Sequence, residues 1–268
     1  MVAVQGCAVA GLTIGLFSRY THGMKTEDLH DEMCAALESI GGIPPEHIRA
    51  DADGSRKCDI VFLNRNVLVE VKTLTSDRAT IQSVKEKNGR LLHKWAVRGR
   101  APIAFGTVNI KLAELEKPVA EDILMNVGQR VRDDLTSADK QISATKRHLG
   151  LDDVHGLIIF VVPAHFRTNN GLIYTVATRH LERRPCAAID TVMIIPAIVE
   201  EGFGAAFPRE LAMTHHAANA EKRLDEDFAF TIMRGWGRHF SQREGIPTLP
   251  MRRVPAEDFE RRFLTPEP

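Results

Sequence analysis

The hydrophobic pattern predicts an amphipathic helix over residues 25–40. Apolar side chains recur there every three or four positions, as on one buried helix face: Leu29, Met33, Ala36, Leu37 and Ile40. Thr26 is placed to cap this helix, and acidic residues fill its first turn, where the helix dipole favours them. Gly41-Gly42 would end it.

Three short strands are predicted to follow. Residues 47–52 form the first, and the stronger two, residues 58–63 and 67–74, are rich in β-branched side chains. A two-residue loop of Asn64 and Arg65 would join the last two strands into a hairpin.

Helices and buried strands then alternate. Helices are expected over residues 78–100, 120–148, 172–183 and 219–242, and strands over 157–162 and 191–195. The pattern predicts an α/β fold with a mixed central sheet flanked by helices. Residues 1–200 would form this domain, and residues 201–268, mostly helical from about residue 205, a C-terminal extension.

The first 17 residues carry no charge, which we interpret as a buried strand or short hairpin, with a membrane-facing segment as the alternative. They lack the basic start of a secretory signal and are too polar for a membrane span, so no membrane partner is expected.

Composition narrows the function classes. The 268 residues carry 35 basic and 35 acidic side chains, so a polyanionic partner would need local patches of charge. The four cysteines lack the spacing of a zinc site and suit a reducing compartment, from which we expect a cytoplasmic protein. Aromatic residues are only 6% of the chain, which disfavours a surface built on base stacking.

The hairpin carries the candidate chemistry. Its register would put Asp59 directly opposite Glu70, and because strand side chains alternate, both would share a face with Lys72. The other face would be apolar and buried: Ile60, Phe62, Val67, Val69 and Val71.

Two facing carboxylates are unfavourable unless a cation neutralises them. Their oxygens suit Mg²⁺ or Mn²⁺, and Lys72 could orient an attacking water or offset phosphate charge. Such a set can hydrolyse a phosphodiester. The alternative is an exposed polar face, with Glu70 and Lys72 solvated and Asp59 paired to Arg56 or Lys57.

Asp59, ten intervening residues and then Glu70-Val71-Lys72 resemble the active-site signature of the PD-(D/E)XK, or restriction-endonuclease-like, nucleases. The resemblance covers residues 25–75, although Cys58 stands where the family often has proline, and it implies an insertion near residues 76–118.

The resemblance implies a metal-dependent nuclease acting on DNA, with RNA left open. Asp59, Glu70 and the Val71 carbonyl would hold Mg²⁺ (or Mn²⁺), and Lys72 would position the water. A non-catalytic nucleic-acid-binding or scaffolding module that keeps the fold is the alternative function, and an unrelated enzyme with a similar hairpin is a third. A homodimer would suit symmetric cleavage of two strands, but nothing in the sequence shows one.

Two helices could complete the site. Glu32 flanks the apolar stripe of the first helix and is the expected additional catalytic acid; a surface acid is the alternative. Gln141 lies beside the stripe of the long helix and resembles the polar side chain that such a helix contributes; a solvated helix shoulder is the alternative.

The stretch from residue 78 to 100 is strongly basic, and Lys and Arg side chains supply most non-specific affinity for nucleic acid. Its candidate nucleic-acid-binding residues are Lys85, Lys87, Arg90 and Lys94. The alternative is an ordinary solvated face, and Trp95 could stack on a base or anchor a core.

Overall fold

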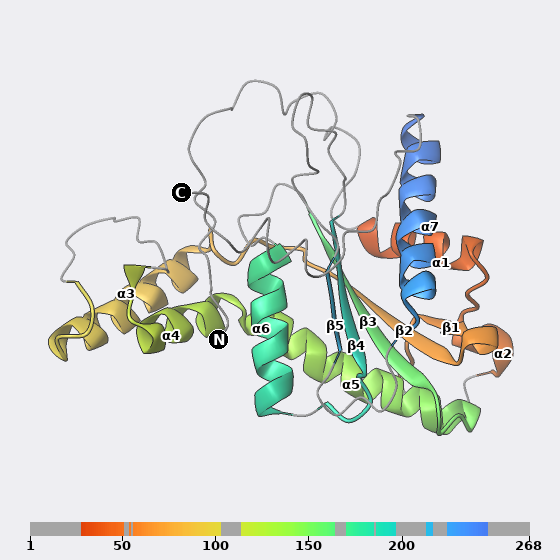
Figure 1. Cartoon of the computed structure of the whole chain (residues 1–268), viewed down its shortest axis with the longest axis horizontal. Coiled ribbons are helices and arrows are strands. Elements are labelled where there is room, and N and C mark those ends of the chain that lie inside the picture. Colours follow the sequence, from red (N-terminus) through yellow and green to blue (C-terminus); the bar gives the residue numbers. More distant parts are fainter. Residues whose placement is uncertain are drawn as a thin grey trace. The chain divides into compact units, whose positions relative to one another are not determined.

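The structure is a computed structural model that describes residues 28–50, 54, 56–102, 114–163, 170–184, 186–196, 213–216 and 224–245 (Figure 1). They fall into two compact units. The sheet unit comprises the described residues up to Ile81 and from Val127 onward, and the helical unit those from Gln82 to Asn126.

A five-stranded mixed sheet organises the sheet unit, in the order β1-β2-β3-β4-β5. The strands are β1 (Ile60–Phe62), β2 (Val67–Thr73), β3 (His155–Val162), β4 (Thr191–Pro196) and β5 (Met213–His216). β1 and β5 are antiparallel to their neighbours, whereas β2, β3 and β4 are parallel to one another. The predicted α/β class with a mixed sheet is confirmed.

Helices cover both faces of this sheet (Figure 1). α1 (Leu29–Ser39) and α7 (Glu226–Glu244) pack together on one face, and α5 (Gln129–Leu149) and α6 (Asn170–Arg183) on the other. A short helix, α2 (Pro45–Ile48), precedes β1. The helical unit is built from α3 (Gln82–Val97) and α4 (Lys117–Val127).

The apolar face of the hairpin forms the main core with α1 and α7. All five residues predicted for that face are buried. The ring of Phe62 packs edge-on against Phe228 of α7, with centroids 4.9 Å apart. Each fully buried side chain of this size stabilises the fold by about 1.5–3 kcal/mol, so this face holds the hairpin firmly on α1 and α7.

Two predictions about local structure before and within the hairpin are wrong. Residues 47 and 48 belong to α2 rather than to a strand, because Pro45 occupies the first helical position, where its fixed φ is preorganised. Residues 51 and 52 lie outside the described residues. The two strands are joined by four residues, not two: Leu63–Arg65 form a 3₁₀ turn and Asn66 is left-handed (φ 51°). The strand register is unaffected by this longer turn.

The helix predicted over residues 120–148 is two helices, α4 and α5, which meet at Gly128. Gly128 packs against Val176 of α6 so closely that an added Cβ would lie 2.4 Å from a Val176 methyl. The apolar stripe from Leu124 to Thr145 is buried throughout, so its periodicity does not reveal the break. The helix predicted over residues 78–100 is observed as the shorter helix α3. The insertion predicted near residues 76–118 overlaps the helical unit.

Of the helical C-terminal extension expected over residues 201–268, the structure describes residues 213–216 and 224–245. Residues 213–216 form β5, which extends the sheet, and α7 covers the core beside α1. Both elements belong to the sheet unit. β5 does so by pairing with β4, and α7 by burying its apolar side on the same sheet face as α1. The interpretations of residues 1–17 and of the Thr26 cap lie outside the described residues. No helix in the described parts is long and apolar enough to cross a membrane.

Gly156→Ala in β3 tests the packing between the sheet and the segment before β4. An added Cβ would lie 1.8 Å from the carbonyl oxygen of Ala188, a backbone atom. We expect the free energy of unfolding to fall by about 3 kcal/mol, measured by urea denaturation. The control is Gly89→Ala on α3, where nothing lies within 4 Å and the helix propensity improves. Wild-type stability in Gly156→Ala would contradict this packing.

Candidate active site

The backbone around Asp59 is fixed from two sides. The Cys58 N–H donates to Thr145 Oγ1 of α5 (2.8 Å), and the Asp59 N–H donates to the carbonyl of Val69 in β2 (3.1 Å). The Val71 N–H then donates to Asp59 Oδ2 (2.7 Å), so the carboxylate accepts the hydrogen bond that a backbone carbonyl would accept if the β1–β2 pairing continued. Asp59 is thereby held against the edge of β2, immediately before β1 begins.

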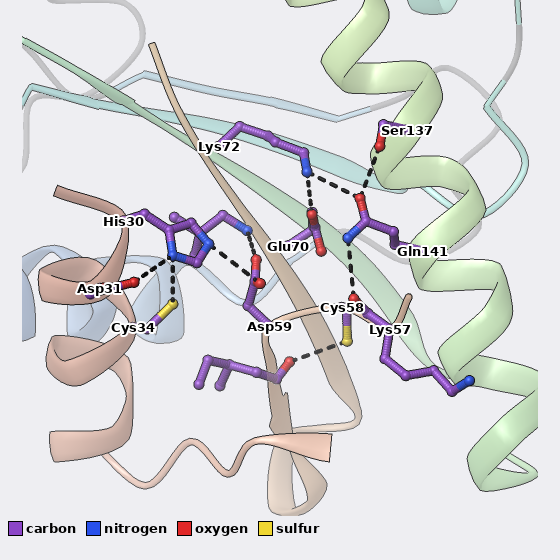
Figure 2. A network of polar contacts seen from close by, with 12 residues as sticks. His30, Asp31, Cys34, Lys57, Cys58, Asp59, Glu70, Lys72, Ser137 and Gln141 are labelled. Carbon is purple, nitrogen blue, oxygen red and sulfur yellow. Dashed lines mark hydrogen bonds and ion pairs between the residues drawn. The ribbon is translucent and has the colours of Figure 1, made fainter. Parts of the chain in front are cut away.

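The hairpin register brings the two predicted carboxylates together. Ile60 pairs with Val69, and Phe62 with Val67, so the next position in the same register puts Asp59 opposite Glu70. This is the register predicted from the sequence. Figure 2 shows the two side chains beside one another, one from each strand.

Glu70 and Lys72 lie on the sheet face that α5 covers. Glu70 is 0% exposed and Lys72 is 9% exposed. The Lys72 ammonium donates to Glu70 Oε1 and to Gln141 Oε1 of α5 (3.1 Å for the latter; Figure 2). The alternative in which both side chains are solvated is therefore wrong.

One oxygen of this buried carboxylate is left unsatisfied. Glu70 Oε2 has no hydrogen-bond partner among the residues that the structure describes. Burial, and next the neighbouring charge of Asp59, raise the pKa of Glu70 to about 7, although Lys72 opposes the shift. Leaving a buried acceptor unpaired costs about 1–3 kcal/mol, and more for a charged one, so this oxygen favours a cationic partner.

The residues present fit a hard divalent metal ion. Asp59 and Glu70 offer carboxylate oxygens, and the Val71 carbonyl lies on the same strand edge as its N–H, which bonds to Asp59. Within the described ranges there is no group of three or more His, Cys, Asp or Glu side chains that could hold a metal by itself. A two-carboxylate set is nevertheless what Mg²⁺ commonly uses, with waters and phosphate oxygens completing the shell.

His30, which the sequence analysis did not identify, also contacts Asp59. We call Asp59, Glu70 and Lys72, with the side chains that contact them, the cluster. His30 lies in the first turn of α1, with Nε2 3.4 Å from Asp59 Oδ1 and Nδ1 3.1 Å from Asp31 (Figure 2). The hydrogen bond with Asp59 is the largest of the effects that raise the pKa of His30 to about 11. Asp59 thus pairs with a histidinium. On a helical wheel, His30 flanks the apolar stripe as Glu32 does, on the opposite side.

Glu32 is not brought to the cluster by any contact in the described part of the chain. Its carboxylate pairs instead with His239 (2.6 Å) and with Arg243, both on α7. The Trp236 ring stacks on His239 in the same region. In this structure Glu32 ties α1 to α7.

Gln141 does join the cluster, as a buried connector. Its Oε1 accepts from Lys72 and from Ser137 Oγ (3.0 Å), and its Nε2 donates to the Lys57 carbonyl (3.1 Å). It is 4% exposed, so it orients Lys72 and supports the segment before Asp59. The contact with nucleic acid expected of Gln141 stays a prediction.

The four basic candidates, Lys85, Lys87, Arg90 and Lys94, are all exposed on α3 of the helical unit. They are thus accessible to a partner, as expected.

The chain was compared with known protein families, curated proteins and solved structures. No protein family matches the chain, and no curated protein or solved structure matches it either.

The raised pKa of Glu70 predicts that the free energy of unfolding falls as the pH rises from about 4.5 to about 7. Between pH 4.5 and about 7 the folded state keeps a proton that the unfolded state loses, so stability contributed by this site is lost as the pH rises. Without divalent ions, Glu70→Gln should therefore gain stability over wild type from pH 5 to pH 8, by a few kcal/mol at about 1.4 kcal/mol per pKa unit. Thermal melting at several pH values measures this.

The control for that series is Glu38→Gln, which removes an exposed carboxylate from α1. Its stability difference from wild type should stay constant with pH. A constant difference for Glu70→Gln as well would contradict the buried, proton-retaining carboxyl.

Proposed function

We propose that this protein is a metal-dependent nuclease that hydrolyses phosphodiester bonds in DNA. The observation that carries the proposal is the pair of facing carboxylates, buried Glu70 and partly exposed Asp59, in which one Glu70 oxygen lacks a partner and a lysine lies alongside. A structural ion pair of Glu70 and Lys72 alone would not need Asp59 opposite it or an unsatisfied oxygen.

The fold supports the same proposal. A helix precedes an antiparallel hairpin, α5 crosses to a parallel third strand, and helices cover both sheet faces. A mixed sheet between helices, with a helix before the hairpin, is compatible with the resemblance to PD-(D/E)XK nucleases and supports the proposal. The isolated bridge of Ile43 to Val61 adds a short pairing on the outer side of β1.

Asp59, Glu70 and the Val71 carbonyl would hold Mg²⁺ or Mn²⁺ in this proposal. The bound ion supplies Lewis-acid stabilisation of charge on the phosphate and a more acidic water. Lys72, fixed by Glu70 and Gln141, donates its third N–H toward the attacking water, and its charge offsets charge on the phosphate. His30 holds the Asp59 carboxylate in position from the opposite side.

The reaction is an ordinary hydrolysis. The water oxygen forms a bond to phosphorus and gives up a proton to solvent, the bond from phosphorus to the 3′ oxygen breaks, and solvent protonates the leaving oxygen. Glu32 has no part in this scheme, because its carboxylate already pairs with His239 and Arg243.

Cleavage assays test the activity directly. Plasmid, linear duplex, single-stranded and four-way-junction DNA would be incubated with Mg²⁺, Mn²⁺ or EDTA. We expect metal-dependent cleavage that falls at least about a hundredfold in both Asp59→Asn and Lys72→Ala. Asp59→Asn removes a carboxylate that would hold the metal ion, and Lys72→Ala removes the ammonium that would act on the attacking water. Glu38→Gln is the control.

Activity that survives in both variants would place the chemistry elsewhere. DNA binding without cleavage, unaffected by metal, would favour the non-catalytic module.

Metal binding can be measured without activity. At pH 8, Mg²⁺ should raise the melting temperature of the wild type, because a ligand that binds only the folded state stabilises it. Asp59→Asn should lose most of this shift, whereas Glu38→Gln should keep it. An equal Mg²⁺ shift in all three proteins would contradict a site at Asp59 and Glu70.

A further inference from the structure

Helix α3 has an uneven distribution of charge. Its inner side is marked by buried Val84 and by half-buried Leu91 and Trp95. Against four lysines and arginines it carries one acidic residue, Glu86, which accepts a hydrogen bond from Gln82.

Three of the basic side chains share one flank of the helix. Lys87, Arg90 and Lys94 are three and four residues apart, so they follow one another along the surface, and all three are exposed. Lys85 lies on the opposite flank, about 160° around the helix from Lys87. We call Lys87, Arg90 and Lys94 the basic stripe.

The basic stripe has one acidic neighbour on its own flank, Glu86, four residues before Arg90. None of its three side chains has an ion pair in the described ranges, although like charges at this spacing cost about 0.2–0.5 kcal/mol per pair. Acids are present in the same unit, but Glu116 pairs with Arg100 and Asp122 accepts from Trp95. Three like charges gathered on one exposed flank match the charge of a polyanion.

Trp95 is unsuited to base stacking. Its Nε1 donates to Asp122 Oδ2 of α4 (2.9 Å), and the guanidinium groups of Arg98 and Arg100 lie 5.3 and 5.2 Å from the ring centroid. The ring joins α3 to α4 under two arginines. What α3 offers a partner is therefore positive charge without an aromatic platform, which suits phosphates rather than bases.

We propose that the basic stripe docks the phosphate backbone of the DNA substrate. From Lys87 to Lys94 the helix rises about 10 Å, which spans about three successive phosphates of one strand along a duplex. The stripe thus supplies affinity without sequence preference. This inference rests on the proposed function for the identity of the substrate.

The test measures binding apart from hydrolysis. A fluorescently labelled DNA duplex would be titrated in EDTA at several salt concentrations, with binding followed by anisotropy. The triple variant Lys87→Ala, Arg90→Ala, Lys94→Ala should bind at least about tenfold more weakly, and its log–log salt slope should be smaller by about 2–3. Alanine favours helix, so α3 should persist, which circular dichroism verifies.

A charge-matched control separates the stripe from general charge. Arg147→Ala, Arg184→Ala, Arg238→Ala removes the same charge from three other exposed positions and should change affinity less than twofold. Lys85→Ala should weaken binding less than Lys87→Ala. Unchanged binding by the stripe variant, equal weakening by both triple variants, or no binding by the wild type would overturn the proposal.

The two proposals fail separately. If the wild type binds DNA through the basic stripe but never cleaves it in Mg²⁺, the stripe proposal holds and the nuclease proposal is contradicted. If the wild type cleaves DNA and the stripe variant cleaves it with the same KM, the nuclease proposal holds and the stripe proposal is contradicted.

Discussion

Glu70 places a carboxylate inside a five-stranded sheet, opposite a second carboxylate on Asp59. In water two such groups repel only weakly, but burial removes the solvent that would screen them. Lys72 and His30 offset part of this cost from two different directions, and one Glu70 oxygen still lacks a partner. The surrounding elements are arranged so that this unfavourable pair keeps its geometry.

Both faces of the sheet contribute to that geometry. From α5, Thr145 holds the Cys58 amide, and Gln141 joins Lys72 to the Lys57 carbonyl. From α1, on the other face, His30 reaches Asp59 at the strand edge. The apolar side of the hairpin packs on α1 and α7, and this packing holds the polar side rigidly against α5. A site that must hold two like charges together needs this rigid support.

The hairpin could be predicted from sequence because its information is local. Alternating polar and apolar residues on both sides of a short turn specify the faces, and one face of valines and a phenylalanine must be buried. The register is therefore recovered even though the turn has four residues rather than two. The strand expected at 47–52 failed for a similarly local reason, since Pro45 starts a helix there.

The choice between His30 and Glu32 could not be made from the sequence. Both flank the apolar stripe of α1, and a helical wheel gives their angles but not what each flank faces. The structure packs the Glu32 flank beside α7, where His239 and Arg243 neutralise it, and brings His30 to Asp59. What Glu32, the expected additional catalytic acid, faces is decided by α7, which is about 200 residues away in the chain.

The sequence by itself therefore determined the α/β class, the paired carboxylates with their lysine and the basic character of α3, because each follows from short-range periodicity and spacing. Only the tertiary structure decided that Glu70 and Lys72 are buried and that β5 and α7 complete the sheet unit. Burial and partner choice depend on elements that meet through long crossovers, and no local pattern encodes which of them meet.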